Sequence, residues 1–240
     1  LRLVISGASA IDPQAVEGFN QFGITAVQGY GMTEAAPMLA AEDSAERCPG
    51  SIGKAFPGIE LAIDEPNADG IGELIARGPN IMSGYYENPE ETEKVLAGGW
   101  LHTGDLACVN EDGFVFICGR KKNVIVLKNG KNVYPEELEQ LISSLPYLEE
   151  NMVFGQPRHE NGDEKDLALC AKIVYKPSYM KEILGLSSAG EIESQIRHDI
   201  DQINKQLPSY KQIFRLVVTD QPMIKTTTGK VKRYEETKNL

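Results

Sequence analysis

The chain has 240 residues, a formal net charge of -11, 41% hydrophobic residues and 25% charged residues. This balance is typical of a globular protein and excludes collagen-like, mucin-like and wholly disordered chains. No apolar run approaches the ~18 residues that span a bilayer, so we expect no transmembrane segment, while peripheral membrane contact stays open. The acidic balance argues against nucleic-acid binding, which usually needs a basic face.

The cysteines and the first residues bear on the compartment and on the start of the chain. Cys48, Cys108, Cys118 and Cys170 are scattered, and none forms a Cys-x-x-Cys pair. Zinc ligands are spaced more closely than this, and a few scattered thiols are typical of a reduced, cytoplasmic protein. The start, Leu1 to Ile5, resembles a buried strand, with no initiator Met and no signal peptide. We therefore expect residue 1 to lie inside a longer protein.

In chain order, the first half alternates short strands with turns. The pattern predicts a strand over 1–6 and a helix over 13–22, capped by Asp12 with Pro13 at the first helical position. Further strands are predicted over 60–63, 72–76, 106–109 and 114–118, with a short helix over 89–96. Asp112-Gly113 joins the last two strands as a hairpin. The segment from 53 to 119 therefore predicts a small antiparallel sheet or partial barrel.

After Gly119 the pattern changes to a compact α+β domain of about 120 residues. A hairpin is predicted from 124–127 and 132–134, with Asn129-Gly130 as a type I′ turn. A helix begins at Pro135, and a second one covers 191–207. Strands are predicted over 152–155, 167–175 and 214–219, followed by a polar basic tail.

The charge changes at the same place. Residues 1–119 hold 5 Lys/Arg and 18 Asp/Glu, so 5 - 18 = -13, and residues 120–240 hold 19 and 17, so 19 - 17 = +2. Either two unlike solvated surfaces or two units with different functions would give this charge asymmetry. We predict two domains, 1–119 and 120–240.

Four segments carry groups that suit a nucleotide. Gly29 to Glu34 combines glycines, a Thr hydroxyl and a carboxylate that suits Mg²⁺, although an ordinary Gly-rich turn would read the same. Asp105, after a glycine, could accept both ribose hydroxyls or only form a turn. Arg120 to Lys122 could contact an anion or be a solvated connector. The tail around Lys230 lacks the Walker A spacing, and could be either a flexible Gly-Lys tip or a solvated basic tail.

Taken together, these segments resemble the adenylate-forming superfamily of acyl-CoA synthetases, luciferases and peptide-synthetase adenylation domains. Five collinear motifs carry the resemblance: 30–34 (YGMTE), 72–74 (GEL) with 84–85 (GY), 103–105 (TGD), 119–120 (GR) and 229–230 (GK). The stretch 119–139 looks most like bacterial long-chain fatty acid–CoA ligases. The resemblance covers the whole chain, as the C-terminal part of such an enzyme.

The resemblance implies a fold of α/β and α+β parts. Residues 1–119 would end the large adenylation domain, including a small distorted β-barrel subdomain, and 120–240 would form a mobile α+β lid. It implies that ATP and a fatty acid give acyl-AMP and pyrophosphate, after which CoA takes the acyl group and AMP leaves. ATP or AMP, Mg²⁺ and CoA are the implied ligands. This chain alone would be inactive, because the phosphate loop and most of the acyl pocket would lie upstream.

The resemblance also assigns roles to residues of the nucleotide site. Adenine-pocket and nucleotide-loop residues would be Gly7, Ala8, Ser9, Tyr30 and Gly31. The phosphate, metal and ribose residues would be Thr33 for the α-phosphate, Glu34 for Mg²⁺, and Asp105 with Arg120 for the ribose.

The remaining roles belong to the predicted lid. Lys122 would be the hinge about which the lid rotates between half-reactions. Lys230 would be the adenylation lysine, bridging the carboxylate and α-phosphate oxygens. The hairpin Lys128, Asn129 and Gly130 would replace it for thioester formation. A Lys where many relatives have Asp at the hinge, and Ile224 where a Pro is common, are departures from the family pattern.

Two alternatives stay open. An aryl- or amino-acid-activating domain that loads a carrier protein would share these motifs. A non-catalytic nucleotide-binding regulatory protein would be expected to lack Lys230, Asp105 or Glu34, and all three are present. The sequence sets neither the chain-length preference nor the oligomeric state.

Overall fold

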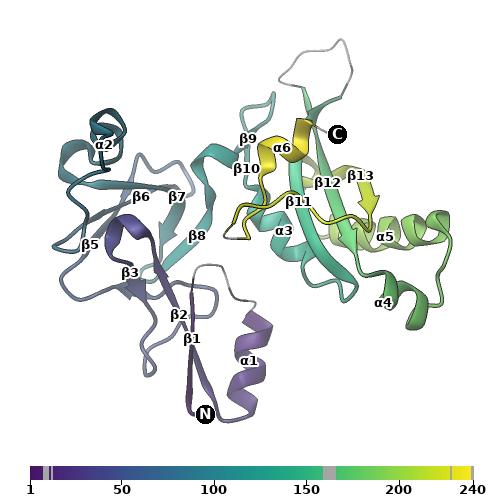
Figure 1. The fold of residues 1–240 in the computed structure, drawn as a ribbon, viewed down its shortest axis with the longest axis horizontal. Helices are drawn as coiled ribbons and strands as arrows, with labels where there is room; N and C mark the ends of the chain where they lie inside the picture. The colour runs from purple at the N-terminus through teal and green to yellow at the C-terminus, as the bar shows by residue number, and fades with distance from the viewer. Residues whose placement is uncertain (8–10, 12, 159–165, 228, 239–240) are drawn as a thin grey trace. The chain divides into compact units, whose positions relative to one another are not determined.

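A computed structural model describes residues 1–7, 11, 13–158, 166–227 and 229–238 (Figure 1). Its contacts divide the chain into two compact units, Leu1–Lys122 and Asn123–Leu240. The division lies close to the boundary expected after Gly119. That the first unit ends an adenylation domain, and that the second is a mobile lid, stay predictions. Asp12, the expected helix cap, lies outside the described residues.

The first unit begins with a four-stranded sheet in the order β1-β2-β3-β4. Strand β1 is parallel to β2, and the other neighbours are antiparallel. Helix α1 packs against β2 (Figure 1). The elements are β1 (Leu3–Ser6), α1 (Pro13–Gln21), β2 (Thr25–Gly31), the short 3-10 helix η1 (Thr33–Ala35), β3 (Met38–Ala41) and β4 (Lys54–Ala55).

The first strand and helix form where the sequence predicts them, but the strand is not buried. Leu3 is 45% exposed and Ile5 is 70% exposed. Among the described strands β1 pairs only with β2, so one edge of β1 is open. An apolar pattern therefore predicted the strand correctly and its burial wrongly, because burial depends on what covers the strand.

The second sheet of this unit is antiparallel, in the order β5-β6-β7-β8. The elements are β5 (Glu60–Asp64), β6 (Gly72–Arg77), α2 (Pro89–Val95), the 3-10 helix η2 (Ala97–Gly99), β7 (Leu101–Val109) and β8 (Val115–Arg120). Helix α2 is capped by Asn88, whose side chain accepts from Glu91 N at 3.2 Å.

The distorted barrel expected here is an open sheet within the described residues, since β5 and β8 are its two edges. The segment before β4 pairs with the edge at Val115: Ile52 N donates to Val115 O at 2.8 Å, and Val115 N donates to Gly53 O at 3.0 Å. These bonds occupy backbone groups that barrel closure would need. One core cluster joins the two sheets of the unit: Ala40, Ile52, Leu74, Ala107 and Val115, with Tyr30 packed against it.

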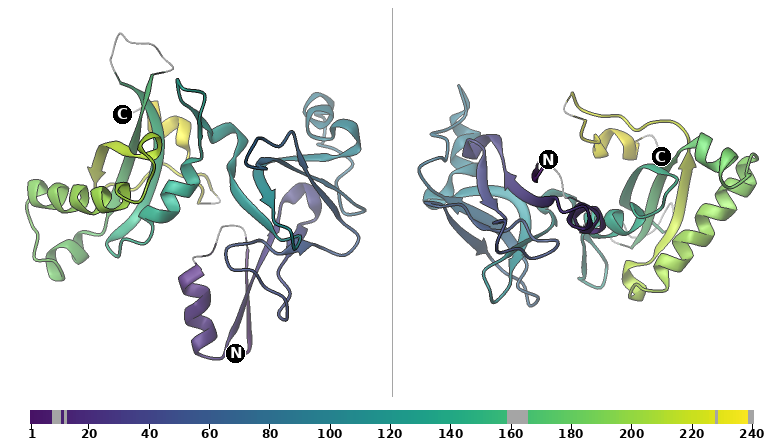
Figure 2. Two further views of the ribbon diagram at one scale, coloured as in Figure 1. Left: turned by 180° about the vertical axis from the view of Figure 1, so that it is seen from behind. Right: turned by 90° about the horizontal axis from the view of Figure 1, so that it is seen from below.

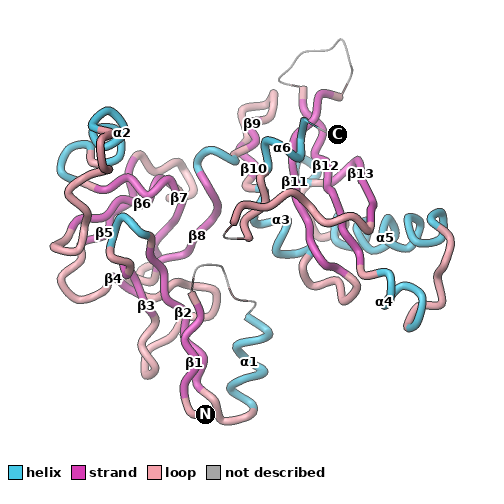
Figure 3. Tube along the Cα trace, viewed as in Figure 1, coloured by secondary structure: helices cyan, strands magenta, loops and turns pink. Residues whose placement is uncertain are grey.

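The second unit is a three-stranded sheet, β11-β12-β13, covered by helices (Figures 2 and 3). Strand β12 is antiparallel to β11 and parallel to β13. Helix α3 packs against β11, and α5 packs against β13 and α3. The elements are the 3-10 helix η3 (Lys121–Asn123), which straddles the division, then β9 (Ile125–Val126), β10 (Asn132–Val133), α3 (Pro135–Ile142), β11 (Leu148–Pro157), β12 (Leu167–Tyr175), α4 (Pro177–Glu182), α5 (Ala189–Asn204), the 3-10 helix η4 (Ser209–Lys211), β13 (Ile213–Thr219) and α6 (Arg233–Lys238).

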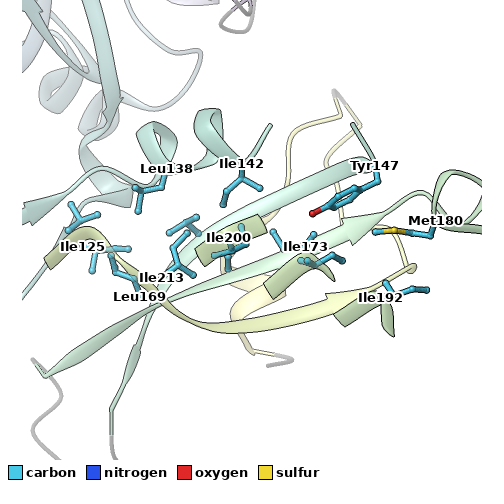
Figure 4. Close-up of a cluster of buried hydrophobic side chains, with 14 residues drawn as sticks. Ile125, Leu138, Ile142, Tyr147, Leu169, Ile173, Met180, Ile192, Ile200 and Ile213 are labelled. Carbon is cyan, nitrogen blue, oxygen red and sulfur yellow. The ribbon is translucent and has the colours of Figure 1, made fainter. Parts of the chain in front are cut away.

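The core of this unit comes from the apolar stripes that the sequence displays. Leu138 and Ile142 from α3 and Ile200 from α5 cluster with Ile173 of the sheet (Figure 4). Ile196 from α5 belongs to the same cluster. These positions are spaced three or four residues apart on each helix, so they share one face. Amphipathic periodicity therefore predicted this core correctly.

Three local details differ from expectation. Helix α5 begins at Ala189 because Ser188 and Glu191 form a capping box, and helices α4 and α6 were not predicted. The β9–β10 hairpin forms, but its turn is not type I′, which needs positive φ at both central residues. Gly130 N closes the turn on Leu127 O at 2.8 Å, so Lys128 and Asn129 are its central residues, and neither has positive φ. Gly130, with φ 76°, follows the turn, and the Asn129 side chain accepts from Lys131 N at 3.0 Å.

Candidate functional site

Tyr30, Asp105 and Arg120 meet in the first unit. The Tyr30 hydroxyl donates to Asp105 Oδ2 at 2.5 Å, and Arg120 Nε lies 2.8 Å from Asp105 Oδ1. Asp105 and Arg120 face each other in the β7–β8 register, so strand pairing sets this ion pair. Asp105 is 7% exposed. An ionised carboxylate only accepts hydrogen bonds, so the cluster presents the kind of acceptor that the hydroxyl groups of a ligand need.

The turn before Asp105 is fixed by buried hydrogen bonds. Thr103 Oγ1 donates to Leu74 O at 2.6 Å and accepts from Asp105 N at 3.1 Å. Gly104 has φ 71°, a conformation that a side chain disfavours. Arg120 Nη1 donates to Thr103 O at 3.2 Å. The Thr-Gly-Asp motif therefore aims the Asp105 carboxylate.

Burial governs the ionisation of Tyr30. Burial, and then the negative charge of Asp105 and the hydrogen bond to it, raise the pKa of Tyr30 far above its usual value of 10.0. The phenol therefore stays protonated at neutral pH and remains a donor to Asp105.

Gly31 is needed where β2 leaves the sheet. A Cβ built on Gly31 would lie 1.8 Å from Pro37 O, which accepts from Met32 N at 2.8 Å. The loop after β2 therefore folds tightly back toward β3, and only glycine fits without moving the backbone. This close approach places Thr33 and Glu34 on the short helix η1, with Thr33 exposed and Glu34 half-buried.

Glu34 is held by a residue to which the sequence analysis assigned no role. The Tyr85 hydroxyl donates to Glu34 Oε1 at 2.8 Å, and Met82 N donates to Glu34 O at 2.8 Å. The hydrogen bond to Glu34, followed by burial, raises the pKa of Tyr85 to about 12. Within the described residues, Glu34 Oε2 takes part in no hydrogen bond, so a hard carboxylate oxygen is available that suits Mg²⁺. The Gly-Tyr motif at 84–85 was the signal for this residue.

The adenine-pocket residues are described only in part. Gly7 follows β1 and is exposed, and a Cβ there would lie 3.3 Å from Gly29 O. Ala8 and Ser9 lie outside the described residues.

A second carboxylate that sequence reasoning left without a role lies under the Thr-Gly-Asp turn. Glu73, 7% exposed, accepts from Gly104 N at 3.0 Å through Oε1. Its Oε2 lies 2.8 Å from Lys121 Nζ and 3.1 Å from His102 Nδ1. Burial favours the neutral acid, but the bonds from Lys121, His102 and Gly104 N outweigh it and hold the pKa of Glu73 below its usual value. Glu73, of the Gly-Glu-Leu motif, is therefore a charged support of the turn.

Lys230 belongs to the second unit, at the end of a tight hairpin. Thr226 N donates to Lys230 O at 2.8 Å, Lys230 N donates to Thr226 Oγ1 at 3.1 Å, and Lys225 pairs with Val231 in an antiparallel bridge. Gly229 has φ 82° and Lys230 is exposed. The backbone at Lys230 is thus ordered by hydrogen bonds while its ammonium faces solvent.

Two carboxylates, Glu236 and Glu150, hold the segments that flank this hairpin on the sheet. Glu236 on α6 accepts from Ile224 N at 2.6 Å and pairs with Lys172 at 2.6 Å, with side chains 4% and 14% exposed. Glu150 accepts from Met223 N at 2.9 Å. Glu150 also pairs with Lys225.

Arg233, at the start of α6, extends this network. It binds both carboxylate oxygens of Glu139 at 2.7 and 2.5 Å, and donates to Val153 O at 3.1 Å. The sequence left this segment open as either a flexible Gly-Lys tip or a solvated basic tail. In the structure it is anchored through Met223, Ile224 and Arg233, while Lys230 is exposed.

Lys122 and the Lys128–Gly130 hairpin complete the predicted residues. Lys122 is exposed, at the last position of the first unit. Lys128, Asn129 and Gly130 form the exposed β9–β10 turn in the second unit. The structure thus brings Tyr30, Asp105 and Arg120 into one cluster and places Glu34 with Tyr85, while Lys230 and the hairpin lie in the other unit. None of the described helices is long and apolar enough to cross a membrane.

Comparison with known proteins assigns both units to one kind of enzyme. Residues 1–86 match the family model described as AMP-binding enzyme, and residues 122–239 match that of the AMP-binding enzyme C-terminal domain. A long-chain-fatty-acid–CoA ligase of Escherichia coli O157:H7 is 32% identical over 215 residues, covering 87% of this chain and 35% of that protein.

Two solved structures show the same fold. A crystal structure of the anthranilate CoA ligase AuaEII in complex with anthranoyl-AMP matches with a TM-score of 0.80 and 26% identity, covering 100% of this chain and 44% of that one. The o-succinylbenzoate CoA synthetase MenE of Bacillus subtilis, in complex with ATP and a magnesium ion, matches with a TM-score of 0.78 and 27% identity, covering 98% and 46%. The chain therefore spans less than half the length of these relatives.

Proposed function

Because this chain belongs to the AMP-binding enzyme family, we propose that it serves the ATP-dependent activation of a fatty acid to acyl-AMP and then to acyl-CoA. The observation that carries the proposal is the cluster of Tyr30, Asp105 and Arg120, a preorganised acceptor for a nucleotide. An exposed lysine on a separate unit, Lys230, supplies the cation that the adenylation step needs.

In this proposal Asp105 binds the two ribose hydroxyls of ATP. Its carboxylate is already oriented by Tyr30 and Arg120, so binding requires no reorganisation of the acceptor. Gly7, Ala8 and Ser9 would contact the adenine, and Tyr30 would lie beside the base. The glycines at 29 and 31 let the backbone approach the nucleotide closely.

Thr33 and Glu34 would act at the phosphates. The Thr33 hydroxyl donates to the α-phosphate, and Glu34 presents Oε2 to Mg²⁺ while Tyr85 fixes Oε1. When bound, Mg²⁺ offsets phosphate charge during attack by a carboxylate. The MenE structure contains ATP and a magnesium ion, which supports ATP and Mg²⁺ as the ligands of this site.

Lys230 would bridge the fatty-acid carboxylate and the α-phosphate oxygens. Both reactants are anions, so a positioned ammonium lowers their repulsion and stabilises the developing charge. After adenylation the second unit rotates about Lys122, Lys230 leaves, and the Lys128–Gly130 hairpin takes its place for attack by the CoA thiol. A net charge of +2 over 120–240 suits a unit that meets ATP and CoA.

The proposed substrate is a long-chain fatty acid, supported by the similarity to the E. coli ligase. An aryl acid is the second candidate, because the anthranilate and o-succinylbenzoate enzymes share the fold. Carrier-protein loading by an amino-acid-activating domain would share the first half-reaction but not the transfer to CoA.

ATP–pyrophosphate exchange by the protein in its full natural length tests the proposal. The acids compared are saturated fatty acids of increasing length, anthranilate, o-succinylbenzoate and the amino acids. We expect exchange with long-chain acids, followed by CoA-dependent release of AMP. Exchange with an aryl acid alone would show that the substrate is an aryl acid and not a fatty acid. Exchange without transfer to CoA would favour a carrier protein as the acyl acceptor. We further propose that residues 1–240 alone give no exchange, since they span 35% of the E. coli ligase.

A further inference from the structure

Lys121, at one side of the division between the two units, is tied to the first unit. Its ammonium lies 2.8 Å from Glu73 Oε2, and Glu73 is 7% exposed. The hydrogen bond to Glu73 raises the pKa of Lys121. Glu73 itself is fixed by Gly104 N, so Lys121 is joined to the rigid sheet that carries the candidate ribose site.

The same acid belongs to a group that could be mistaken for a metal site. Ligand atoms of Asp64, Glu73 and His102 lie within 4.8 Å of one another. The Lys121 ammonium, however, already lies on the Glu73 oxygen that faces His102. A fixed cation in that position serves the carboxylate as its counter-charge, so the group is better explained as an anchor for Lys121.

Asn123, at the other side of the division, is tied to the second unit. Its amide nitrogen Nδ2 donates to Glu136 Oε1 at 2.6 Å. Glu136 lies in the first turn of α3, whose Leu138 and Ile142 are fully buried. Glu136 Oε2 is buried and accepts no hydrogen bond within the described residues. Arg233 Nη2 lies 4.0 Å from Glu136 Oε1, beyond hydrogen-bond distance, so Asn123 is the described side chain that donates a hydrogen bond to this carboxylate.

Lys122 lies between these two anchored residues and is exposed. No described side chain forms a hydrogen bond or ion pair with the Lys122 side chain. We propose that Glu73 and Glu136 are positioning residues that clamp the two neighbours of Lys122, each to its own unit, and so confine rotation to a single residue. This inference rests on the proposed alternation of the second unit between two half-reactions.

The physical reason is conformational entropy. A rotation confined to Lys122 lets the second unit reach few orientations, so each catalytic orientation is well populated. Freeing the backbone of one neighbour would add a residue of freedom and dilute each catalytic orientation about five- to thirtyfold. Glu73 and Glu136 would then raise the rates of both half-reactions without touching any substrate. In this they would differ from Lys230, which would contact the substrates.

The test uses the full-length protein with the variants Lys121→Met and Asn123→Asp. Lys121→Met removes the ion pair but leaves the bond between Glu73 and Gly104. Asn123→Asp replaces the donor with a like charge facing Glu136. Lys121→Arg and the double variant Asn123→Asp/Glu136→Gln should restore each pair, because Arg keeps the charge and Gln offers a donor to the new Asp.

Hydrogen exchange of the peptide 119–125 measures the anchoring without any substrate. We expect exchange to rise at least about fivefold in the two single variants and to return near the wild-type rate in the restoring variants. The control variants Lys94→Met and Gln221→Glu alter exposed residues of each unit and should leave the rate unchanged. Unchanged exchange in both single variants would overturn the proposal.

The two half-reactions provide the functional measurement. In the single variants kcat for adenylation, and kcat for thioester formation from supplied acyl-AMP, should both fall about five- to thirtyfold, with KM for ATP unchanged. Wild-type kcat in both steps despite faster exchange would also overturn the proposal. If wild-type protein forms no acyl-AMP, the proposed function fails, while the exchange measurement still confirms or overturns the two clamps.

Discussion

The Tyr30 hydroxyl donates to Asp105 across 75 residues of sequence and between two different sheets of the first unit. Tyr30 is the last residue but one of β2, and Asp105 follows the Gly104 turn within β7. A core shared by the two sheets holds these elements together. The candidate ribose site therefore depends on the packing of the unit as well as on its motifs.

We predict that Asp105→Asn raises KM for ATP about ten- to a hundredfold. The change removes the charge that Arg120 and the ribose hydroxyls contact, and hydrogen bonds to charged groups contribute about 1.5–3 kcal/mol. Tyr30→Phe should raise KM for ATP tenfold or less, because Arg120 still orients the carboxylate. ATP-dependent kinetics of the full-length protein measure both. Tyr86→Phe, at a side chain that is 89% exposed, is the control; an equal rise there would contradict a specific role.

Lys230→Ala should lower adenylation at least about a hundredfold, the scale of losing one preorganised charge donor. Thioester formation from supplied acyl-AMP should be largely spared, since Lys230 would leave the site in that step. Pyrophosphate exchange and CoA transfer are measured separately. Lys232→Ala, which removes only an exposed pair with Glu235, should change neither step. Equal loss of both steps in Lys230→Ala would contradict the assigned role.

Glu34→Gln should raise the Mg²⁺ concentration needed for half-maximal exchange about tenfold or more, because a neutral oxygen binds a hard cation more weakly. Tyr85→Phe should have a smaller effect, since Glu34 keeps its charge and loses only an orienting donor. Magnesium titrations of the exchange reaction measure both. An unchanged Mg²⁺ requirement in Glu34→Gln would contradict the role of Glu34 as a metal ligand.

Glu236 should make the second unit sensitive to acid. Burial favours its neutral form, but Ile224 N and Lys172 outweigh burial and lower the pKa of Glu236 below its usual 4.5. The folded state therefore binds this proton less readily than the unfolded chain does. Its contribution is complete above pH 4.5 and is lost as the pH falls through the lowered pKa of the folded protein.

Glu236→Gln should destabilise the protein at pH 7 by roughly 3 kcal/mol, because Lys172 stays buried without its counter-charge. The difference from wild type should narrow as the pH falls below about 4. Urea unfolding across pH measures it. Glu235→Gln, at an exposed neighbour, should change the free energy of unfolding by at most about 1 kcal/mol. A constant difference at every pH would show that charge is not the cause.

Gly31→Ala should destabilise the protein by about 3 kcal/mol or more, because the new Cβ would lie 1.8 Å from Pro37 O. Gly18→Ala is the matched control: its Cβ meets nothing within 4 Å, and alanine should stabilise helix α1 by about 0.5–1 kcal/mol. Thermal unfolding of the two variants measures the difference. Equal melting temperatures would contradict the close approach at Gly31.

The sequence by itself determined the elements whose signal is local. Helix α3 and helix α5 follow from apolar residues spaced three or four apart, and the hairpins follow from Asp112-Gly113 and Asn129-Gly130. The five collinear motifs likewise marked Asp105, Glu34 and Lys230 as candidates before any geometry was known. These signals depend on neighbours a few residues apart, which a sequence displays directly.

Only the tertiary structure decided which residues support those candidates. These supports are contacts between different elements of the chain. Glu73 accepts from Gly104, Tyr85 donates to Glu34, and Glu236 contacts Ile224 and Lys172. Local pattern also predicted a buried first strand, and the resemblance implied a small distorted barrel. The strand is exposed and the described sheet is open, because burial and pairing depend on distant partners. An Asp or Glu is the same letter in the sequence whether its carboxylate faces water or neutralises a buried cation. Only the residues packed around it decide which of these two roles it has.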